Sequence, residues 1–280
     1  MPELPEVETV RRGLEPVLKG RRIVKVTARR RDLRRPLPND FARRVKGRRV
    51  IAVGRRAKFL VVTLDGGETL IVHLGMSGRI KIFKKNPPAP EAHDHVLFET
   101  DKGVFIYYCD PRRFGLMALT RSEDLDGHPF FRGLGPEPLE RGFNGSSLAV
   151  RLKGRKTSIK AALMDQRVVA GLGNIYVSES LFRAGISPRR KASTVQGERA
   201  VKLARAIKEV LKKAIRAGGS TLRDHRLPSG ELGYFQHQFA VYGRTGEKCP
   251  GCTCDVRKTG GIRQITQGGR STFYCATRQR

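Results

Sequence analysis

The sequence predicts an α+β protein: a β-rich N-terminal half, then a helical segment, then a small C-terminal hairpin module. Three observations predict this class. Short apolar segments punctuated by Gly, Pro or Asp recur through residues 23–119. A 3.6-residue apolar stripe follows between Leu203 and Ile215. Residues 244–280 combine Cys, Gly and alternating β-type positions.

In the first half a helix is expected to precede the strands. Pro5 suits the first helical position, and Val7, Val10 and Leu14 follow at i, i+3 and i+7. Many short strands at such spacing favour a sandwich or a barrel. The strands are expected at Ile23–Val26, Val50–Val53, Phe59–Leu64, Thr69–Leu74, Val96–Phe98, Val104–Tyr108 and Leu116–Leu119.

The second half is expected to be helical. Residues 124–147 are rich in Gly, Pro and acids and are typical of an interdomain linker. Two helices are expected within 155–182, and a third carries the later stripe and ends at Gly218-Gly219. We therefore predict an N-terminal domain at 1–133, a linker at 134–147, a helical domain at 148–240 and the hairpin module at 241–280.

The charge is strongly basic. The chain has 56 Lys or Arg and 26 Asp or Glu, a formal net charge of +30. Residues 11–58 hold 19 Lys or Arg against three acids, a net charge of +16. This balance favours DNA or RNA as the partner over an enzyme with a merely solvated basic face. No apolar run approaches the roughly 20 residues that span a bilayer, and no signal peptide is expected at the acidic, Pro-containing start.

The N-terminus offers a candidate nucleophile. Removal of Met1 would expose the secondary amine of Pro2, which can form a Schiff base when it is unprotonated. A free α-amine has a pKa of about 7.7–8.0, and the positive end of a following helix lowers it further. Glu3 and Glu6 stand beside it as candidate proton donors or acceptors. The other interpretation is a helix start with acids in its first turn.

Several positions in the β-rich half could serve DNA chemistry. Lys58 lies where a basic cluster meets an apolar strand. It could act as an acid or bind a phosphate, or it could be an ordinary lysine at the edge of the strand. Met76 lies on a tight turn, and Arg112 and Phe114 lie on a second one; such side chains can wedge into a base stack, or be ordinary turn residues. For the His93-Asp94-His95 cluster a phosphate contact or a core hydrogen bond is expected rather than a metal, since adjacent strand residues face opposite ways.

The C-terminal cysteines form most of a zinc site. Cys249 and Cys252 have the spacing of one ligand pair. The second pair is incomplete, because Cys275 is followed by Arg278 where the fourth ligand is expected. Cys254 is a possible substitute, although one residue separates it from Cys252. The residues leave zinc binding open.

Taken together, these motifs resemble the formamidopyrimidine-DNA glycosylases, the bacterial 8-oxoguanine repair enzymes. The resemblance extends along nearly the whole chain. It rests on MPELPEVETVRRGLEP, RRAKFL, HLGMSG, HDH, DPRRFG, LGPEPL, KTSIKAALMDQ, GLGNIYVSESLF, YGRTGEKC and GRSTFYC.

The resemblance implies a β-sandwich with a leading helix, then a helix–two-turn–helix domain with a hairpin finger, and DNA in the cleft between them. It also implies a monomeric cytoplasmic enzyme that acts on double-stranded DNA containing oxidised bases. The implied activity is bifunctional: the enzyme excises the base and cleaves the abasic strand without a cofactor for the chemistry. Zincless members of the wider superfamily fold the same hairpin, so the missing cysteine need not remove the finger.

The resemblance also implies roles for single residues. Pro2 would be the nucleophile at the sugar C1′ and Glu3 the proton donor, with Glu6 as an active-site carboxylate. Lys58 would be the acid of β-elimination, and Arg270 would assist δ-elimination or grip a phosphate. Met76, Arg112 and Phe114 would fill the emptied duplex, and His93, Lys156 and Asn174 would contact the DNA backbone.

Two other functions fit parts of the sequence. An endonuclease VIII-type glycosylase would prefer oxidised pyrimidines, but Leu4, the complete trio of duplex-filling residues and the segment Ser220–Phe235 favour the purine enzyme. That segment resembles the loop that covers a flipped purine. A catalytically degenerate DNA-binding homologue is the other alternative, and every proposed catalytic residue is nevertheless present.

Overall fold

A computed structural model describes residues 1–220, 233–253 and 255–280. The chain divides into two compact units. The first comprises Met1–Arg132 and Ile215–Gln236, and the second comprises Gly133–Ala214 and His237–Arg280. The predicted α+β class is confirmed, with the β-rich part first in the chain.

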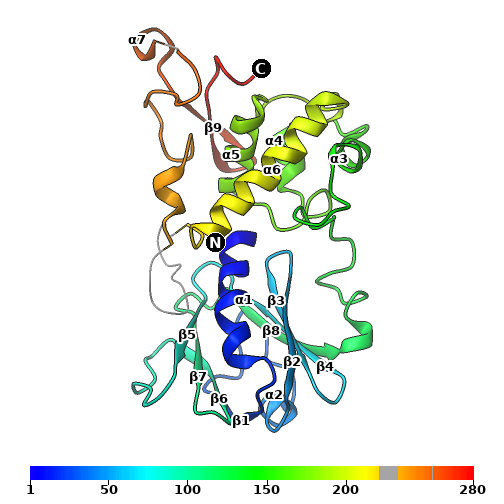
Figure 1. Cartoon of the computed structure of the whole chain (residues 1–280), viewed down its shortest axis with the longest axis vertical. Coiled ribbons are helices and arrows are strands. Elements are labelled where there is room, and N and C mark those ends of the chain that lie inside the picture. Colours follow the sequence, from blue (N-terminus) through cyan, green and yellow to red (C-terminus); the bar gives the residue numbers. More distant parts are fainter. Residues whose placement is uncertain (221–232, 254) are drawn as a thin grey trace. The chain divides into compact units, whose positions relative to one another are not determined.

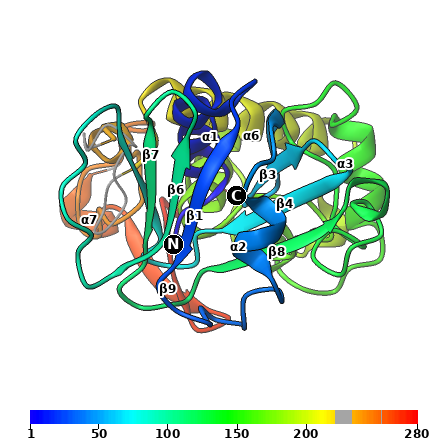
Figure 2. The same ribbon diagram turned by 90° about the horizontal axis from the view of Figure 1, so that it is seen from below.

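The first unit contains two antiparallel four-stranded sheets, visible as separate layers in Figure 2. One has the order β1 (Ile23–Ala28), β6 (Asp94–Thr100), β7 (Phe105–Cys109), β5 (Arg79–Phe83). The other has the order β2 (Val50–Arg56), β3 (Phe59–Leu64), β4 (Glu68–His73), β8 (Leu116–Arg121). Apolar side chains from both sheets form one core, so the sandwich is confirmed and a barrel is not formed.

Helix α1 (Leu4–Leu18) runs beside β2 and covers this core (Figure 1). Its buried face includes Val7, Val10 and Leu14, as the periodicity predicted. The short helix α2 (Phe41–Val45), the 3-10 turn η1 (Ser122–Asp124) and strand β5 were not predicted. In β5 the basic residues Arg79 and Lys81 alternate with apolar ones on a partly exposed strand, so no continuous apolar run marks it.

The second unit is mainly helical, and its expected helices are confirmed. It contains α3 (Gly145–Leu152), α4 (Ile159–Met164), α5 (Asn174–Ala184), η2 (Ala192–Thr194), most of α6 (Glu198–Arg216), and α7 (Val256–Thr259). The 3-10 turn η3 (Phe235–Gln238) spans the boundary between the units. The long helix α6 buries the predicted stripe, and Gly218 just beyond its end has φ of 77°. No helix in the described ranges is long and apolar enough to cross a membrane.

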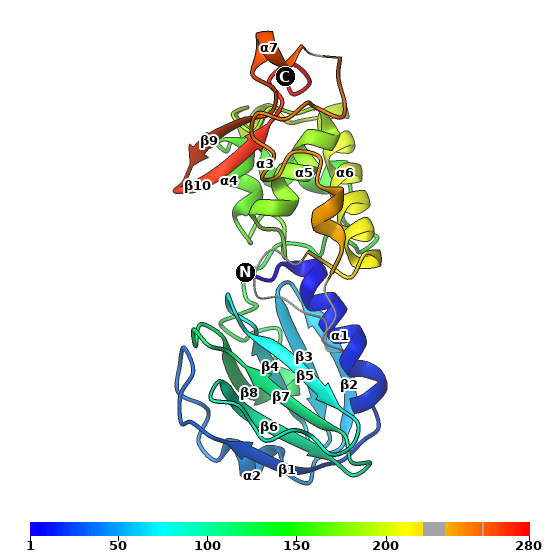
Figure 3. The ribbon, with the colours of Figure 1, turned by 90° about the vertical axis from the view of Figure 1, so that its left-hand side faces the viewer.

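The C-terminal hairpin is confirmed as β9 (Arg263–Gln267) paired with β10 (Arg270–Tyr274). Figure 3 shows it beside α4 and α5. Arg270 pairs with Gln267 across the turn Gly268-Gly269, in which both glycines have positive φ. Arg270 therefore lies at the first position after the tip.

Candidate active site and nucleic-acid interface

The start of α1 gathers three of the predicted residues. Pro2, Glu3 and Glu6 are all buried. Glu6 Oε2 accepts the Glu3 backbone N–H at 2.9 Å, in a capping box that these two glutamates form. Glu6 Oε1 accepts both the backbone N–H (2.8 Å) and the hydroxyl (3.0 Å) of Ser220. One carboxylate thus fixes the helix start and the chain that follows Gly219.

Lys58 lies in the turn between β2 and β3 and is 7% exposed. Ala57 before it has φ of 52°, a left-handed conformation that neighbouring contacts must hold. Arg55 supplies one such contact, because its Nη1 donates to the Ala57 carbonyl at 2.8 Å.

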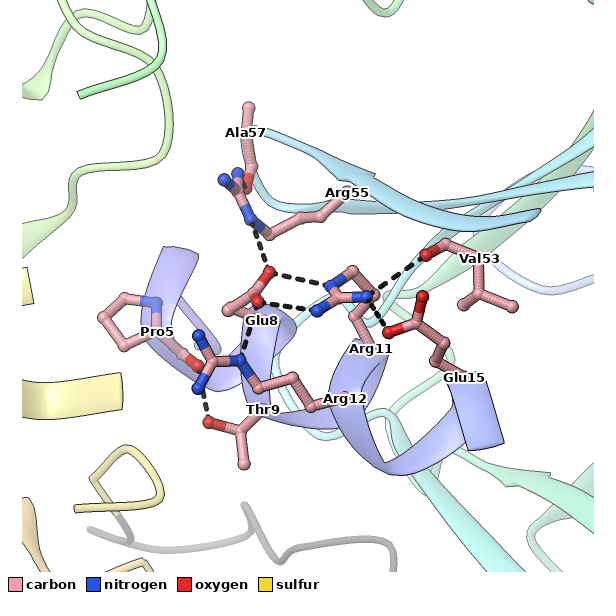
Figure 4. A network of polar contacts seen from close by, with 9 residues as sticks. All are labelled: Pro5, Glu8, Thr9, Arg11, Arg12, Glu15, Val53, Arg55 and Ala57. Carbon is pink, nitrogen blue, oxygen red and sulfur yellow. Dashed lines mark hydrogen bonds and ion pairs between the residues drawn. The ribbon is translucent and has the colours of Figure 1, made fainter. Parts of the chain in front are cut away.

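A polar network ties that turn to α1 (Figure 4). The Nε of Arg55 lies 3.4 Å from Glu8 Oε2. Glu8 also accepts hydrogen bonds from Arg11 and Arg12. Burial alone would raise the pKa of Glu8, but the hydrogen bonds from Arg11 and Arg12 lower it overall. A stable carboxylate on α1 therefore holds the arginine that supports the Lys58 turn.

His73 is a functional candidate that the sequence analysis missed. Burial and the positive charges of Lys58 and Arg34 lower the pKa of His73 to about 4. Its Nδ1 accepts the Gly75 backbone N–H at 3.0 Å, which fixes the entry to the Met76 turn. The ring is therefore neutral at physiological pH. The only sequence signal was its place at the start of HLGMSG.

The two candidate wedge turns lie against each other. A Cβ placed on Gly75 would come within 2.3 Å of the Phe114 carbonyl carbon, so the backbones are in direct contact. Met76 is 40% exposed and Phe114 is 43% exposed. The Arg112 guanidinium stacks 4.8 Å from the centre of the Phe114 ring. The structure thus presents one sulfur-containing, one aromatic and one cationic side chain from a single surface region.

The HDH residues have separate partners. His93 is exposed, whereas Asp94 is buried and ion-paired with Lys81 at 2.9 Å. His95 Nε2 makes a buried hydrogen bond of 2.9 Å with the Asp110 carbonyl. The expected core hydrogen bond therefore belongs to His95, and within the described part of the chain no metal cluster involves these residues.

In the second unit, Arg270 is exposed at the start of β10 and its neighbours are anchored. Asn174, the first residue of α5, donates Nδ2–H to the Ser271 carbonyl at 2.8 Å. Lys160 on α4 is 1% exposed, and its Nζ donates to the same carbonyl (3.1 Å) and to Thr272 Oγ1 (2.5 Å). Burial and the charge of Arg270 lower the pKa of Lys160 to about 8. Lys156, in contrast, is exposed ahead of α4.

The predicted metal ligands converge in part. The sulfurs of Cys249, Cys252 and Cys275 lie within 4.8 Å of one another, the one such cluster among the described residues. Arg278 Nη1 donates to the Gly251 carbonyl at 2.7 Å, and its guanidinium lies 5.1 Å from the centre of the Phe182 ring. Because an arginine keeps its proton, Arg278 cannot be a ligand. Cys254 lies outside the described residues.

Most of the predicted purine-covering segment, residues 221–232, also lies outside the described residues. Its two ends are described. Ser220 forms a β-bridge with Tyr234, and Phe235 donates its N–H to the Gly219 carbonyl at 3.0 Å. The segment therefore starts and finishes at one place, next to Glu6.

Comparisons with known proteins all point to one family, the formamidopyrimidine-DNA glycosylases. The family model for the formamidopyrimidine-DNA glycosylase N-terminal domain matches residues 1–117, and that for the H2TH domain of the same enzymes matches residues 134–226. The formamidopyrimidine-DNA glycosylases of Rhodospirillum rubrum and Azorhizobium caulinodans are 56% and 57% identical to the chain over the full length of both partners.

Solved structures show the same likeness. The MutM (Fpg) protein of Thermus thermophilus has a TM-score of 0.85 and 40% identity, covering 99% of this chain and 98% of its own. The wild-type Lactococcus lactis Fpg, in a complex with DNA containing N7-benzyl-Fapy-dG, has a TM-score of 0.88 and 33% identity with both chains fully covered. The same protein in a complex with abasic-site DNA gives a TM-score of 0.87.

Proposed function

The chain belongs to the formamidopyrimidine-DNA glycosylase family, and we propose that it excises 8-oxoguanine and formamidopyrimidines from double-stranded DNA and then cleaves the abasic strand. It is a bifunctional glycosylase and abasic-site lyase of base-excision repair. The observation that supports the purine specificity is the full-length likeness to Lactococcus lactis Fpg, which was solved with DNA containing N7-benzyl-Fapy-dG and, as a mutant, with DNA containing Fapy-dG.

We propose that Pro2, after removal of Met1, attacks the sugar C1′. The N–C1′ bond forms as the glycosidic bond breaks, and its electron pair leaves with the base. The amine proton is lost and offsets the negative charge on the departing base. The nitrogen lone pair then opens the sugar ring: the C1′–O4′ bond breaks, O4′ takes a proton from Glu3, and an iminium forms between Pro2 and C1′. This iminium acidifies the adjacent C2′ proton, whose loss expels the 3′ phosphate by β-elimination with Lys58 as the acid. Arg270 assists the second elimination. These substitution and elimination steps are assisted by proton transfer, involve no external oxidant or reductant, and need no cofactor.

The proposed DNA contacts follow from exposure and chemistry. A base inside the duplex must be extruded, which costs a few kcal/mol and is partly offset by inserted side chains. Met76, Arg112 and Phe114 are exposed on adjoining turns and suit that role. Phosphate contacts are proposed for His93, Lys156 and Asn174, the first two of which are exposed.

We also propose zinc as the metal for the cysteine cluster. Three thiolates are soft ligands that suit zinc, and a structural site needs a fourth. Because Arg278 cannot bind the metal, Cys254 is the proposed fourth ligand. The zinc would hold the base of the hairpin together, and no chemical step passes through it.

We propose that residues 1–133 carry the chemistry, and that residues 148–240 and 241–280 grip the DNA after the linker 134–147. We further propose that the enzyme acts as a monomer in the bacterial cytoplasm. The relatives named above are bacterial proteins that match this chain from end to end.

The central experiment compares cleavage of duplexes that carry 8-oxoguanine or thymine glycol, with borohydride present to trap the iminium. We expect preference for 8-oxoguanine and a covalent adduct on the Pro2 peptide. Preference for thymine glycol would instead support the endonuclease VIII-type activity.

Pro2→Gly is expected to lose most lyase activity, and full retention would contradict the mechanism. Absence of any adduct from the parent protein would indicate a degenerate binding protein.

A further inference from the structure

A buried carboxylate lies directly behind the two wedge turns. Asp110, the residue directly after β7, is 0% exposed. Its Oδ1 accepts the Ser77 hydroxyl from the Met76 turn at 2.6 Å. Its Oδ2 accepts the Gly115 backbone N–H at 2.8 Å and the Tyr108 hydroxyl at 3.2 Å. The two oxygens therefore bind the two turns separately.

Ser77 links the turns a second time. While its hydroxyl donates to Asp110, its oxygen accepts the Arg112 backbone N–H at 3.2 Å. The main chain of Asp110 is held as well, since its carbonyl accepts the Arg113 N–H at 3.1 Å and its own N–H donates to the His93 carbonyl at 3.0 Å. Arg113 has φ of 55°, a left-handed conformation that this set of bonds maintains.

The two turns pack closely against each other and against β4 and β7. A Cβ on Gly115 would lie 1.7 Å from the Tyr108 hydroxyl and 2.7 Å from the His73 carbonyl. A Cβ on Gly75 would overlap the Phe114 and Gly115 backbone. Both glycines are thus required by close backbone approach, and Met76 and Phe114 project from one block.

We propose that Asp110, acting through Ser77, is a positioning group that locks the two turns together, so that Met76, Arg112 and Phe114 enter the duplex as one preformed wedge. This inference rests on the void-filling role in the proposed function. Ordering side chains at the moment of binding costs conformational entropy, and a preformed wedge avoids that cost. The lock therefore acts on base extrusion and not on the chemistry at Pro2.

The test uses Ser77→Ala, which removes the shared hydroxyl but keeps all three wedge side chains. 2-Aminopurine placed beside 8-oxoguanine reports unstacking of the duplex in stopped-flow fluorescence. Ser77→Ala removes both hydrogen bonds of this hydroxyl, to Asp110 and from the Arg112 N–H. We therefore expect the unstacking phase to slow by at least about tenfold. Borohydride trapping on a single-stranded abasic oligonucleotide, in which no base is extruded, should remain within about twofold. Asp110→Asn should act in the same direction.

A matched control lies in the same sandwich. Thr69 and Ser122 share a hydroxyl hydrogen bond of 2.9 Å at the far end of β4 and β8 from His73 and Leu116. Ser122→Ala also removes a serine hydroxyl and its hydrogen bond from this sandwich, and it should leave the fluorescence phase unchanged. Thermal unfolding of each variant identifies any general loss of stability.

A double-mutant cycle separates positioning from general damage. If Ser77 acts through the wedge, Ser77→Ala should cost much less in a Met76→Ala background than in the parent. If the effects of Ser77→Ala and Met76→Ala on the unstacking rate are additive, the inference is overturned. It is also overturned if Met76→Ala slows unstacking but Ser77→Ala does not. If Met76→Ala itself leaves unstacking and excision unchanged, the void-filling part of the proposed function fails instead.

Discussion

Buried carboxylates in this protein accept backbone N–H groups from segments outside regular structure. Glu6 accepts from Ser220, Asp110 accepts from Gly115, and Glu179 on α5 accepts from residues 240–242 at 2.9 to 3.0 Å. Burial raises the pKa of Glu179, and these backbone hydrogen bonds oppose the rise. A buried polar group left without partners is costly, so each carboxylate holds its segment in one place.

His73 gives a prediction about pH. The pKa of His73 is about 4 in the folded protein against 6.5 ordinarily, so between these values the unfolded chain binds a proton that the folded protein does not. Stability should therefore fall as pH decreases from 6.5 to 4. His73→Asn keeps an acceptor for Gly75 but does not titrate in this range. Relative to that variant, the parent should lose about 1–2 kcal/mol, allowing for residual solvation of the ring.

Urea unfolding at several pH values checks this expectation. Groups other than His73 titrate in both proteins and cancel in the difference. If the difference in free energy of unfolding between the parent and His73→Asn stays constant from pH 7 to pH 4, His73 takes up its proton equally well in the folded protein, and the prediction is wrong.

At the scale of elements, the contact between α1 and the β2–β3 turn predicts a rate effect. Glu8→Gln should weaken the hold on Arg55 and so loosen the Lys58 turn. We expect elimination at a preformed abasic site to slow by about three- to tenfold, the effect of a partly buried charged contact of about 1 kcal/mol. The trapped adduct should still form, because Pro2 is unchanged. Single-turnover strand cleavage measures the step.

Glu15→Gln is the matched control for Glu8→Gln. Glu15 accepts a hydrogen bond of 2.7 Å from the same Arg11 and, among the residues that the structure describes, forms no ion pair with the Lys58 turn. Its loss should leave elimination within about twofold of the parent. Equal slowing by both substitutions would mean that α1 as a whole is perturbed.

The cysteine cluster at the base of the hairpin leads to a prediction about its fourth metal ligand. If Cys254 is the fourth ligand, Cys254→Ser should lose stoichiometric zinc in the presence of a competing chelator. Adding Arg278→Cys to that variant should restore it, raising zinc affinity by at least about tenfold, because four thiolates close the site. Zinc per chain, measured with a chromogenic chelator, gives the answer. Retention of zinc by Cys254→Ser alone would assign the fourth position to another group.

The helices and strands that the sequence predicted are those with a regular spacing of apolar residues or with Gly, Pro or Asp at their ends. The stripe of α6 and the apolar strand β3 satisfy this condition. Strand β5 and helix α3 do not, since β5 alternates basic and apolar residues and α3 begins inside a Gly-rich stretch. Their formation depends on pairing with β7 and on packing in the second unit, which local patterns do not report.

The same reason explains what was missed in the site. The proposed catalytic residues Pro2, Glu3 and Lys58 could be named from motifs, whereas the sequence around Lys160 is that of an ordinary exposed helix lysine. Its burial depends on Thr272, which lies 112 residues further along the chain. Asp110 likewise gains its partners from a turn that lies 33 residues earlier. Long-range hydrogen bonds leave no periodic trace, so their residues emerge only from the fold.

For the whole molecule, the net charge of +30 predicts that DNA binding weakens as the salt concentration rises. Each phosphate neutralised releases counterions, so log K should fall linearly with log salt with a slope of about −0.9 per phosphate contact. Lys156→Ala should reduce that slope by about 1 and weaken lesion and undamaged DNA equally, because phosphate contacts carry no sequence information. Lys212→Ala removes the same charge from α6 and should leave the slope unchanged. Fluorescence anisotropy across a salt series distinguishes these outcomes, and a loss confined to lesion DNA would show that Lys156 contacts the damaged nucleotide instead.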